Sequence, residues 1–288
     1  MKKIIFLLAI TSCSFLHAQN LSLSAGLGTT TYAGDLQAKG FNIRLSNFSF
    51  SAGAAYRFSQ HVSAGISLFT GKVYASDSDF SGAYIKRNLS FHSNIFDVNA
   101  QVEYDFLRTE KAGDFTPYIF AGVGFFHFNP YAYDASGVKT YLQPLGTEGQ
   151  GLQQYPDKKM YALTQFNIPY GAGIKFNLSE QLSAGIELNF RKLFTDYLDD
   201  VSTTYADSTA LLNGRGAKAV ELAFRGDELK PPIPFPKEGD IRGNPAKKDT
   251  YTFILLRLTY NFPQSNFGGF GKHSKYSLKQ NGCPKKIL

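Results

Sequence analysis

Apolar and polar residues alternate along several stretches of the chain, which is the pattern of β-strands whose two faces meet different surroundings. The clearest stretch runs from Phe96 to Phe106, where every second residue is apolar or aromatic and the residues between are Asp, Asn, Gln and Glu. Similar alternation predicts further strands at 48–58, 62–68, 165–176, 182–191 and 251–262. Two weaker segments, 21–29 and 118–126, complete a set of eight. The segment 118–126 is apolar on both faces, so its orientation stays open.

Strand length and loop length together favour a membrane barrel. The longest alternating runs reach the about 9–11 residues that a tilted strand needs to span a bilayer. Short connections (59–61, 107–115, 177–181) alternate with long ones (30–47, 71–94, 127–163, 192–250). This order predicts a closed eight-stranded antiparallel transmembrane β-barrel with four long extracellular loops and short periplasmic turns. Both chain ends then fall on the periplasmic side.

The polar face of these strands carries charged residues that we expect inside the barrel. Lipid offers no hydrogen-bonding partner to a bare strand edge, so the first and last strands must pair and enclose a lumen. A charge on the lipid face would cost about 2–4 kcal/mol at the midplane. The predicted partners of lumen salt bridges are Arg57, Glu103, Lys175, Glu187, Arg191 and Arg257. Tyr and Phe would form the interfacial belts, because the chain has no Trp.

The first residues resemble an export signal. Lys2 and Lys3 precede a short apolar run, and small residues follow it. We favour cleavage after Ala18, which makes 1–18 a signal peptide. Lipidation at Cys13 is the alternative. The predicted organisation is then a signal peptide (1–18), an outer-membrane barrel (19–262) and a basic periplasmic tail (263–288).

The tail is a candidate for binding a partner. It carries five lysines and no acidic residue after Phe267, so it could meet an acidic partner or an anionic membrane surface. Cleavage after Ala18 leaves Cys283 as the single cysteine, which suggests an intermolecular disulfide or a free thiol. The candidate partner-binding residues are Cys283, Lys272, Lys275, Lys279, Lys285 and Lys286. An exported chain is not expected to bind nucleic acid.

Little in the sequence indicates catalysis or a cofactor. The glycine-rich segment 146–151 has no preceding strand and contains Glu148, so a tightly turned loop is favoured over a phosphate cradle. Asp196, Asp199 and Asp200 are weak candidates for a calcium site, since their spacing is not that of an EF-hand. No nucleophile motif is found. A short helix is expected within 207–224, limited by its glycines.

Seven motifs, in this order along the chain, resemble those of the PorG-like outer-membrane barrel proteins of the type IX secretion machinery. They are Tyr32-Ala33-Gly34-Asp35-Leu36, Arg87-Asn88-Leu89-Ser90-Phe91, Thr116-Pro117-Tyr118, Phe128-Asn129-Pro130, Pro144 to Gly151, Thr195 to Ser202 and Arg242-Gly243-Asn244-Pro245; Cys283-Pro284 near the end also fits. The segment 225–249 departs from the pattern by its many prolines.

The resemblance implies a non-enzymatic structural component of the secretion machinery. Its barrel would anchor a periplasmic ring of PorK-like lipoprotein and PorN-like subunits to the outer membrane, with Cys283 and the tail lysines at the contact. The main alternative is a small outer-membrane barrel that binds a lipid or other small ligand through its long loops. An enzyme at the loop rim ranks third, and a diffusion pore is disfavoured because side chains nearly fill an eight-stranded lumen.

Overall fold

A computed structural model describes residues 20–37, 45–79, 83–107 and 111–263. One compact unit, Asn20–Phe262, contains all the strands. The second unit comprises 1–19 and 263–288. Apart from Pro263, its residues lie outside the described ranges, and so do the expected signal peptide, Cys13, Cys283 and the tail lysines.

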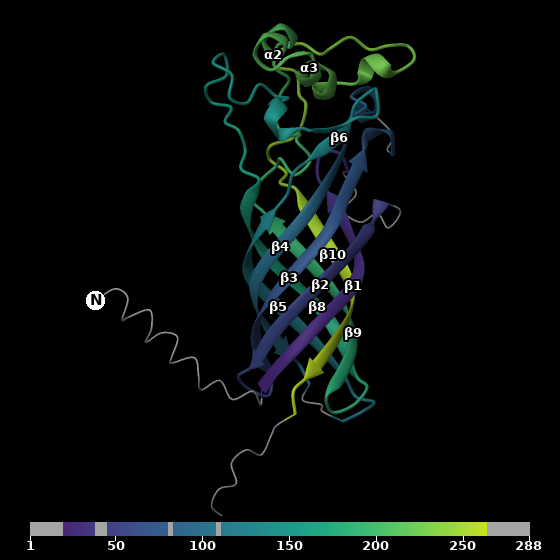
Figure 1. Cartoon of the computed structure of the whole chain (residues 1–288), viewed down its shortest axis with the longest axis vertical. Helices are drawn as coiled ribbons and strands as arrows, with labels where there is room; N and C mark the ends of the chain where they lie inside the picture. The colour runs from purple at the N-terminus through teal and green to yellow at the C-terminus, as the bar shows by residue number, and fades with distance from the viewer. Residues whose placement is uncertain (1–19, 38–44, 80–82, 108–110, 264–288) are drawn as a thin grey trace, which may run out of the picture. The chain divides into compact units, whose positions relative to one another are not determined.

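Eight long strands form a closed antiparallel barrel (Figure 1). They are β1 (Leu21–Ala33), β2 (Asn47–Arg57), β3 (Val62–Ser76), β4 (Ser90–Asp105), β5 (Phe115–His127), β8 (Thr164–Asn177), β9 (Leu182–Leu193) and β10 (Thr250–Asn261). The barrel closes where β1 pairs with β10, with Leu27 opposite Leu256. Every barrel strand therefore has a partner on both edges. The predicted closed, eight-stranded antiparallel barrel is confirmed.

A two-stranded hairpin extends the sheet beyond the barrel, and the sequence pattern did not predict it. β6 (Tyr131–Tyr133) and β7 (Lys139–Tyr141) lie within the connection that was expected to be a loop. β4 also begins earlier than predicted, and its pairing with β5 ends where Phe96 meets His127. The free edge of the first residues of β4 is then available to β6, which pairs with it at His92.

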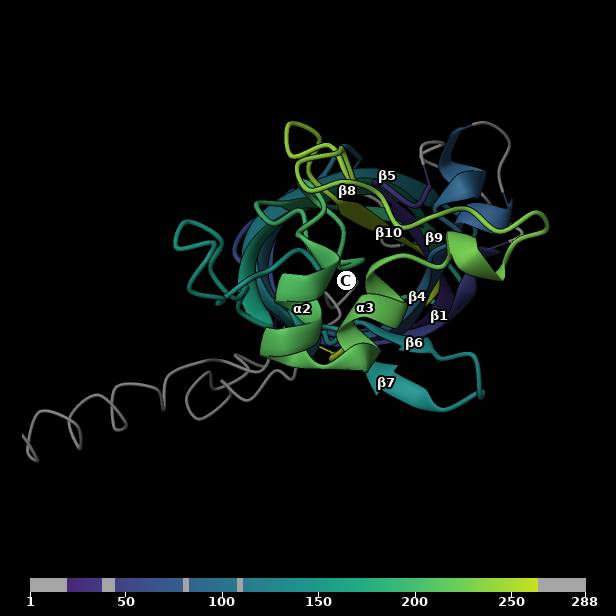
Figure 2. The ribbon, with the colours of Figure 1, turned by 90° about the horizontal axis from the view of Figure 1, so that it is seen from above.

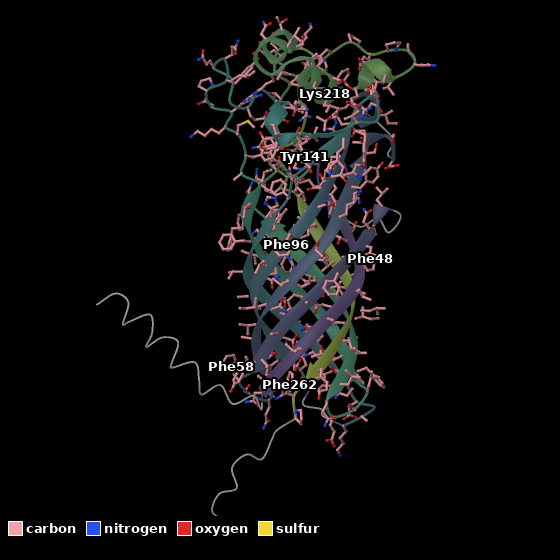
Figure 3. All side chains as sticks on the ribbon, viewed as in Figure 1. Phe48, Phe58, Phe96, Tyr141, Lys218 and Phe262 are labelled. Carbon is pink, nitrogen blue, oxygen red and sulfur yellow. The ribbon has the colours of Figure 1, made fainter. Side chains whose placement is uncertain are left out.

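The barrel is apolar outside and polar inside. Its outward positions include Val102, Ile119 and Leu256, with 54%, 47% and 67% of their surface exposed. Figure 3 shows Phe48, Phe58, Phe96 and Phe262 on the outer surface. The inward positions of the same strands carry buried polar residues: Ser49, Ser51, Ser67, Asp97, Asn99, Gln101, Glu103, Asp105, Asn167, Glu187, Asn189 and Arg191.

The orientation of β5, open from the sequence, is settled by packing inside the barrel. Tyr118 and Phe120 point inward and are almost fully buried. The facing strand offers Gly171 and Gly173, and a Cβ on Gly173 would lie 2.5 Å from the Tyr118 ring. The aromatic face of β5 therefore fits inside because glycines of β8 leave room for the rings.

The long connections gather at one end, the loop end, and the short ones at the other, the turn end (Figure 1). Seen from above, α2 (Ser208–Arg215) and α3 (Ala217–Ala223) lie over the barrel opening (Figure 2). The expected helix is thus divided by Gly216, whose φ of 88° suits glycine. Within the described ranges, no helix is both long enough and apolar enough to cross a membrane. The loops also contain short 3₁₀ helices at Asp77–Asp79, Ala83–Lys86, Gln143–Leu145 and Gly226–Glu228.

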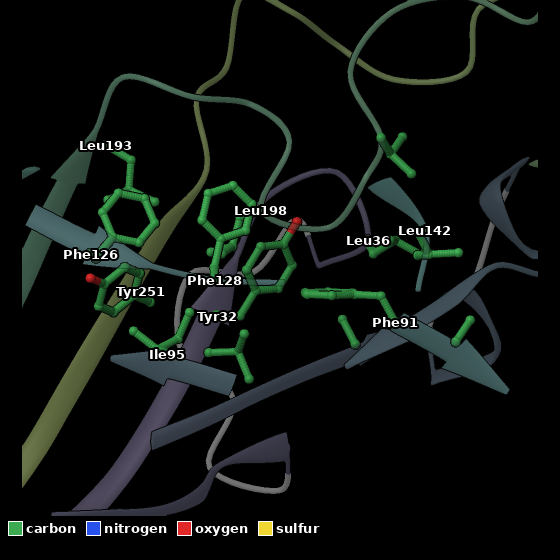
Figure 4. Packing of buried hydrophobic residues seen from close by; sticks show 14 of the residues in the cluster. Tyr32, Leu36, Phe91, Ile95, Phe126, Phe128, Leu142, Leu193, Leu198 and Tyr251 are labelled. Carbon is green, nitrogen blue, oxygen red and sulfur yellow. The ribbon is translucent and has the colours of Figure 1, made fainter. Parts of the chain in front are cut away.

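A hydrophobic core fills the barrel near the loop end and continues into the loops (Figure 4). Tyr32, Phe91, Phe128 and Leu198 in this core are at most 1% exposed. Its members come from barrel strands and from the long connections alike. The loops are therefore packed onto the barrel and form an ordered cap.

Candidate functional site: a filled lumen beneath a buried polar cap

The turn half of the lumen is filled by an ion-pair network, here called the lumen network. Lys175 Nζ lies 2.5 Å from Glu103 Oε1 and 2.7 Å from Asp105 Oδ1. Arg257 Nη1 lies 2.7 Å from Glu187 Oε2 and 3.3 Å from Glu103 Oε2. The Tyr118 hydroxyl donates to Glu187 at 2.8 Å. Each buried charge thus has an opposite charge, as buried ions require.

Above this network, Arg191 crosses the lumen. Its Nε lies 2.8 Å from Asp97 Oδ2, and both side chains are fully buried. Tyr251 and Asn167 also donate to that oxygen, each at 2.7 Å. The guanidinium carbon is 4.7 Å from the centroid of the Phe69 ring. The arginine therefore joins the polar lower lumen to the aromatic core above it.

Five of the six residues expected in lumen salt bridges take part in these ion pairs, and Arg57 lies half-buried near the turn end of β2. The structure adds two partners, Asp97 and Asp105, that the candidate set lacked. Both stand on the polar face of the 96–106 alternation, so the same signal could have included them.

The cap contains a second buried network, here called the cap network, with Arg242 at its centre. Its Nη1 lies 3.0 Å from Glu148 Oε1, and its Nη2 lies 3.7 Å from Asp200 Oδ2. The same guanidinium donates to the carbonyls of Asp200 and Ala223. Burial disfavours its charge, but the carboxylates of Glu148 and Asp200 outweigh burial and raise its pKa. Arg242 therefore stays charged and holds three segments together.

Glu148 receives several hydrogen bonds besides that ion pair. Ser202 N and Thr203 N donate to Oε1 at 2.8 and 3.1 Å, and the Thr203 hydroxyl donates to Oε2 at 2.6 Å. The loop around Glu148 turns tightly because Gly146, Gly149 and Gly151 have positive φ angles. The glycine-rich segment thus presents a carboxylate inward, where it binds protein groups.

Arg87 connects further loops to the cap network. It forms a two-pronged ion pair with Asp77, at 2.9 Å from Nε and 2.7 Å from Nη2. It also donates to the carbonyl oxygens of Asp35 and Arg242, at 3.1 and 2.5 Å. Asn244 N donates in turn to the Asp35 carboxylate at 2.8 Å. Because of these contacts, all four long connections join one buried polar cluster.

Two carboxylates lie close to one tyrosine in the cap. The Tyr32 hydroxyl is 2.5 Å from Asp199 Oδ2 and 3.1 Å from Asp249 Oδ1. Burial raises the pKa of both carboxyls, helped by the nearby Asp35 for Asp199 and by Asp199 for Asp249. The folded cap therefore favours a proton on this pair.

The three weak calcium candidates do not form a cation cage. Asp199 accepts from Tyr32 and from the backbone, Asp200 accepts from the hydroxyls of Thr147 and Tyr161, and Asp196 accepts from Ser202. In the part of the chain that the structure describes, no group of three or more His, Cys, Asp or Glu residues is arranged to hold a metal ion. Apart from Asp196 Oδ1, which is buried with no hydrogen-bond partner, their oxygens bind protein donors, as loop-stabilising aspartates do.

The fold and these two networks define the class of protein: a closed eight-stranded antiparallel barrel with ion pairs in its lumen and loops packed over one end. The chain belongs to the DUF6089 family, described as a domain of unknown function, whose model matches residues 1–215. No curated protein matches the sequence.

Solved barrels provide distant comparisons. Neisserial surface protein A shares 10% identity over 84% of this chain and 97% of its own, with a TM-score of 0.43. Ail of Yersinia pestis, solved with a heparin analogue, shares 11% over 85% and 99%, with a TM-score of 0.40. OprG of Pseudomonas aeruginosa shares 11% over 86% and 98%, with a TM-score of 0.39. The fold assignment therefore rests on the strand pairing itself.

Proposed function

We propose that the chain is an outer-membrane barrel that serves as a structural, non-enzymatic component of the type IX protein secretion machinery, anchoring the periplasmic ring to the outer membrane. The observation that carries the membrane location is the reversed polarity of the barrel. Large apolar side chains face outward on every strand, and the ion-paired charges of the barrel face inward, while the outward lysines Lys72 and Lys192 stand near the loop end. Such a surface is stable in lipid and unfavourable in water.

A structural role is consistent with the interior of the barrel. The lumen network and Arg191 occupy the lower and middle lumen, and the hydrophobic core fills the barrel above them. A solute would have to break buried ion pairs to pass. The barrel is therefore suited to holding other components in place.

The secretion role rests on the resemblance of the seven sequence motifs to those of the PorG-like proteins. The cap network supports this resemblance, because it brings several of these motifs together in space. Asp35, Arg87, Glu148, Asp200 and Arg242 belong to five different motifs, yet they join one buried cluster. An ordered set of motifs that meets in space acts as one structural feature. Separate chance matches would have no reason to converge.

In this proposal the turn end faces the periplasm. β1 begins and β10 ends at the turn end. The residues that precede the barrel in the sequence and those that follow it are therefore joined to it at that end. The tail lysines Lys272, Lys275, Lys279, Lys285 and Lys286 would then contact the PorK-like and PorN-like subunits. Cys283 would form an intermolecular disulfide with one of them.

The test is a non-reducing pull-down of the tagged full chain from solubilised outer membranes, with partners identified by mass spectrometry. We expect PorK-like and PorN-like subunits, and an adduct at Cys283 that disappears on reduction. Cys283→Ser removes the adduct, and replacing the five tail lysines by Gln weakens recovery of the ring. Lys237→Gln, in an exposed part of the cap, is the matched control and leaves recovery unchanged.

Two other outcomes would change the proposal. Recovery of the ring with no adduct keeps the role and discards the disulfide. A barrel recovered alone, or with bound lipid only, contradicts the secretion role and favours the lipid- or ligand-binding alternative.

A further inference from the structure

The β6–β7 hairpin gives the barrel an extra patch of outward-facing sheet at its loop end. β3 and β4 run past the end of β5, and β6 and β7 continue the sheet sideways from β4. Tyr141 of β7 lies above Phe96 of the apolar belt in Figure 3. The outer face of this four-stranded patch is therefore continuous with the outer face of the barrel.

Aromatic rings form a continuous row across this face, here called the aromatic ladder: Tyr74, His92, Tyr131, Tyr133 and Tyr141. His92 stacks between Tyr74, at 4.6 Å between centroids, and Tyr131, at 5.4 Å. Tyr133 meets the His92 ring edge-on at 5.5 Å, and Tyr141 meets Tyr131 at 6.0 Å. Tyr133 and Tyr141 each remain 44% exposed.

Two lysines lie against the same ring of the ladder. Lys139 Nζ is 3.9 Å from the Tyr131 centroid and 4.8 Å from that of Tyr141. Lys72 Nζ, from β3, is 5.8 Å from the Tyr131 centroid. Ring faces attract each ammonium, but the two like charges repel one another. An anion between them would relieve that repulsion.

The outward strand positions around these lysines carry no acid, and the acid described at the end of the ladder, Asp79, bonds to the Tyr74 hydroxyl. Outward residues of β3 near Lys72 are Thr70 and Tyr74, and those of β4 are Ser90, His92 and Asn94. The hairpin contributes tyrosines and Lys139 to this face. Asn94 stands directly opposite Lys72 in the register, so its exposed amide is a neighbouring donor. The described face thus offers two cations and an amide.

The height of the patch matches the headgroup layer. Leu68 is the last large apolar residue that faces outward on β3. Lys72 lies four residues beyond it, or roughly 13 Å along the strand. Tyrosines and lysines at this level are typical of the membrane–water interface, where lysine stems lie along apolar surface and ammonium groups reach phosphates.

We propose that the aromatic ladder with Lys72 and Lys139 is a binding site for a phosphorylated lipid of the outer leaflet. Its phosphate lies between the two ammonium groups and its acyl chains lie along the apolar belt below. The proposal rests on the membrane location proposed above and is independent of the secretion role.

The experiment uses the full chain purified in detergent and native mass spectrometry with diphosphoryl lipid A as the probe. The same lipid with its phosphates removed and inorganic phosphate serve as comparison probes. We expect bound diphosphoryl lipid A, weak binding of the dephosphorylated lipid, and no displacement by inorganic phosphate.

The double variant Lys72→Gln, Lys139→Gln lowers lipid A affinity by at least about tenfold, the size expected for losing one charge-assisted bond. Lys192→Gln, an outward lysine at the loop end of β9 on another side of the barrel, is the matched control and leaves affinity unchanged. Tyr133→Leu and Tyr141→Leu, which keep both charges, lower affinity less.

Several results would overturn the site. Equal affinity in the wild type and the double variant, or in the double variant and Lys192→Gln, removes the role of these lysines. Equal binding of the dephosphorylated lipid, or displacement by inorganic phosphate, contradicts recognition of a lipid phosphate. A protein absent from outer membranes refutes the membrane proposal itself, whereas correct location with unchanged lipid binding refutes this inference alone.

Discussion

Arg242 stabilises the cap because it is a buried charge whose partners are also buried. Its side chain is 1% exposed, and that of Glu148 is fully buried. An ion pair of this kind is not worth a large net stability by itself, because both ions lose their hydration. Removing one partner is costly, since the other charge is left buried without compensation.

We expect Arg242→Met to destabilise the cap by about 3–5 kcal/mol, because Glu148 and Asp200 lose their cation. Amide hydrogen exchange across 195–203 measures the change, and exchange there becomes faster. Lys237→Met, at an exposed position of the cap, is the control and leaves protection across 195–203 unchanged. Equal protection in the two variants would contradict the central role of Arg242.

The buried aspartates of the cap make its stability depend on pH. Burial raises the pKa of Asp196 from 3.8 to about 7 and that of Asp200 from 3.8 to about 6. Between the ordinary pKa of 3.8 and these raised values, the folded cap therefore binds more protons than the unfolded chain. Its stability is greatest at low pH and is lost as the pH rises through 6 and 7.

We expect hydrogen exchange at 195–203 to be slower at pH 5.5 than at pH 8, after correction for the intrinsic exchange rates. Each carboxyl contributes a slope of up to about 1.4 kcal/mol per pH unit. Asp196→Asn keeps an oxygen for the Ser202 hydroxyl and reduces the slope, whereas Asp157→Asn, on an exposed turn, leaves it unchanged. A slope of the opposite sign would refute the assignment.

At the scale of the strand, each barrel strand separates two environments. Outward side chains meet the surroundings of the barrel, and inward ones meet the lumen network or the core. The two faces therefore tolerate different substitutions. An outward charge is harmless in water and costly in lipid, which makes it a probe of location.

We expect Val102→Arg, outward on β4, to lower the free energy of unfolding in lipid vesicles by about 2–4 kcal/mol. A urea titration followed by gel mobility of unheated samples measures this difference. The control is Ile241→Arg in the cap, where 82% of the isoleucine is exposed, and it changes stability little. If both variants unfold alike, the outer surface does not contact lipid.

The sequence predicts some strands of this structure better than others. Strict alternation predicted β4 because its two faces differ at every step. It could not orient β5, whose inward Tyr118 and Phe120 depend on glycines of another strand. The β6–β7 hairpin is too short for a periodic signal, and it forms because β4 offers a free edge.

The buried networks show the same limit. Alternation placed Glu103, Lys175 and Arg257 on polar faces, but their pairing depends on closure of the barrel, which brings together residues up to 154 positions apart. In the cap, Arg242 and Glu148 are separated by 94 positions with no periodic pattern between them. Only the packing of the loops brings these two side chains together.

For the whole molecule, the filled interior predicts the absence of a steady conductance. Purified chain added to a planar lipid bilayer is expected to give no stable channel steps, because ions would have to pass the side chains of the lumen network and the core. A porin measured in the same bilayer is the positive control. Reproducible steps that scale with salt concentration would show that the lumen opens.

The β1–β10 seam has a consequence for how the chain is made. The first strand finds its partner only when the last has been synthesised, since Leu27 pairs with Leu256. Until then, β1 presents one unpaired edge, and such edges associate readily with other chains. Forming so distant a contact is slow, because the chain between the two strands loses conformational entropy before their pairing can compensate for that loss. Every newly made copy is therefore open to such association until β10 is in place, and truncation before Thr250 leaves a sheet that cannot close.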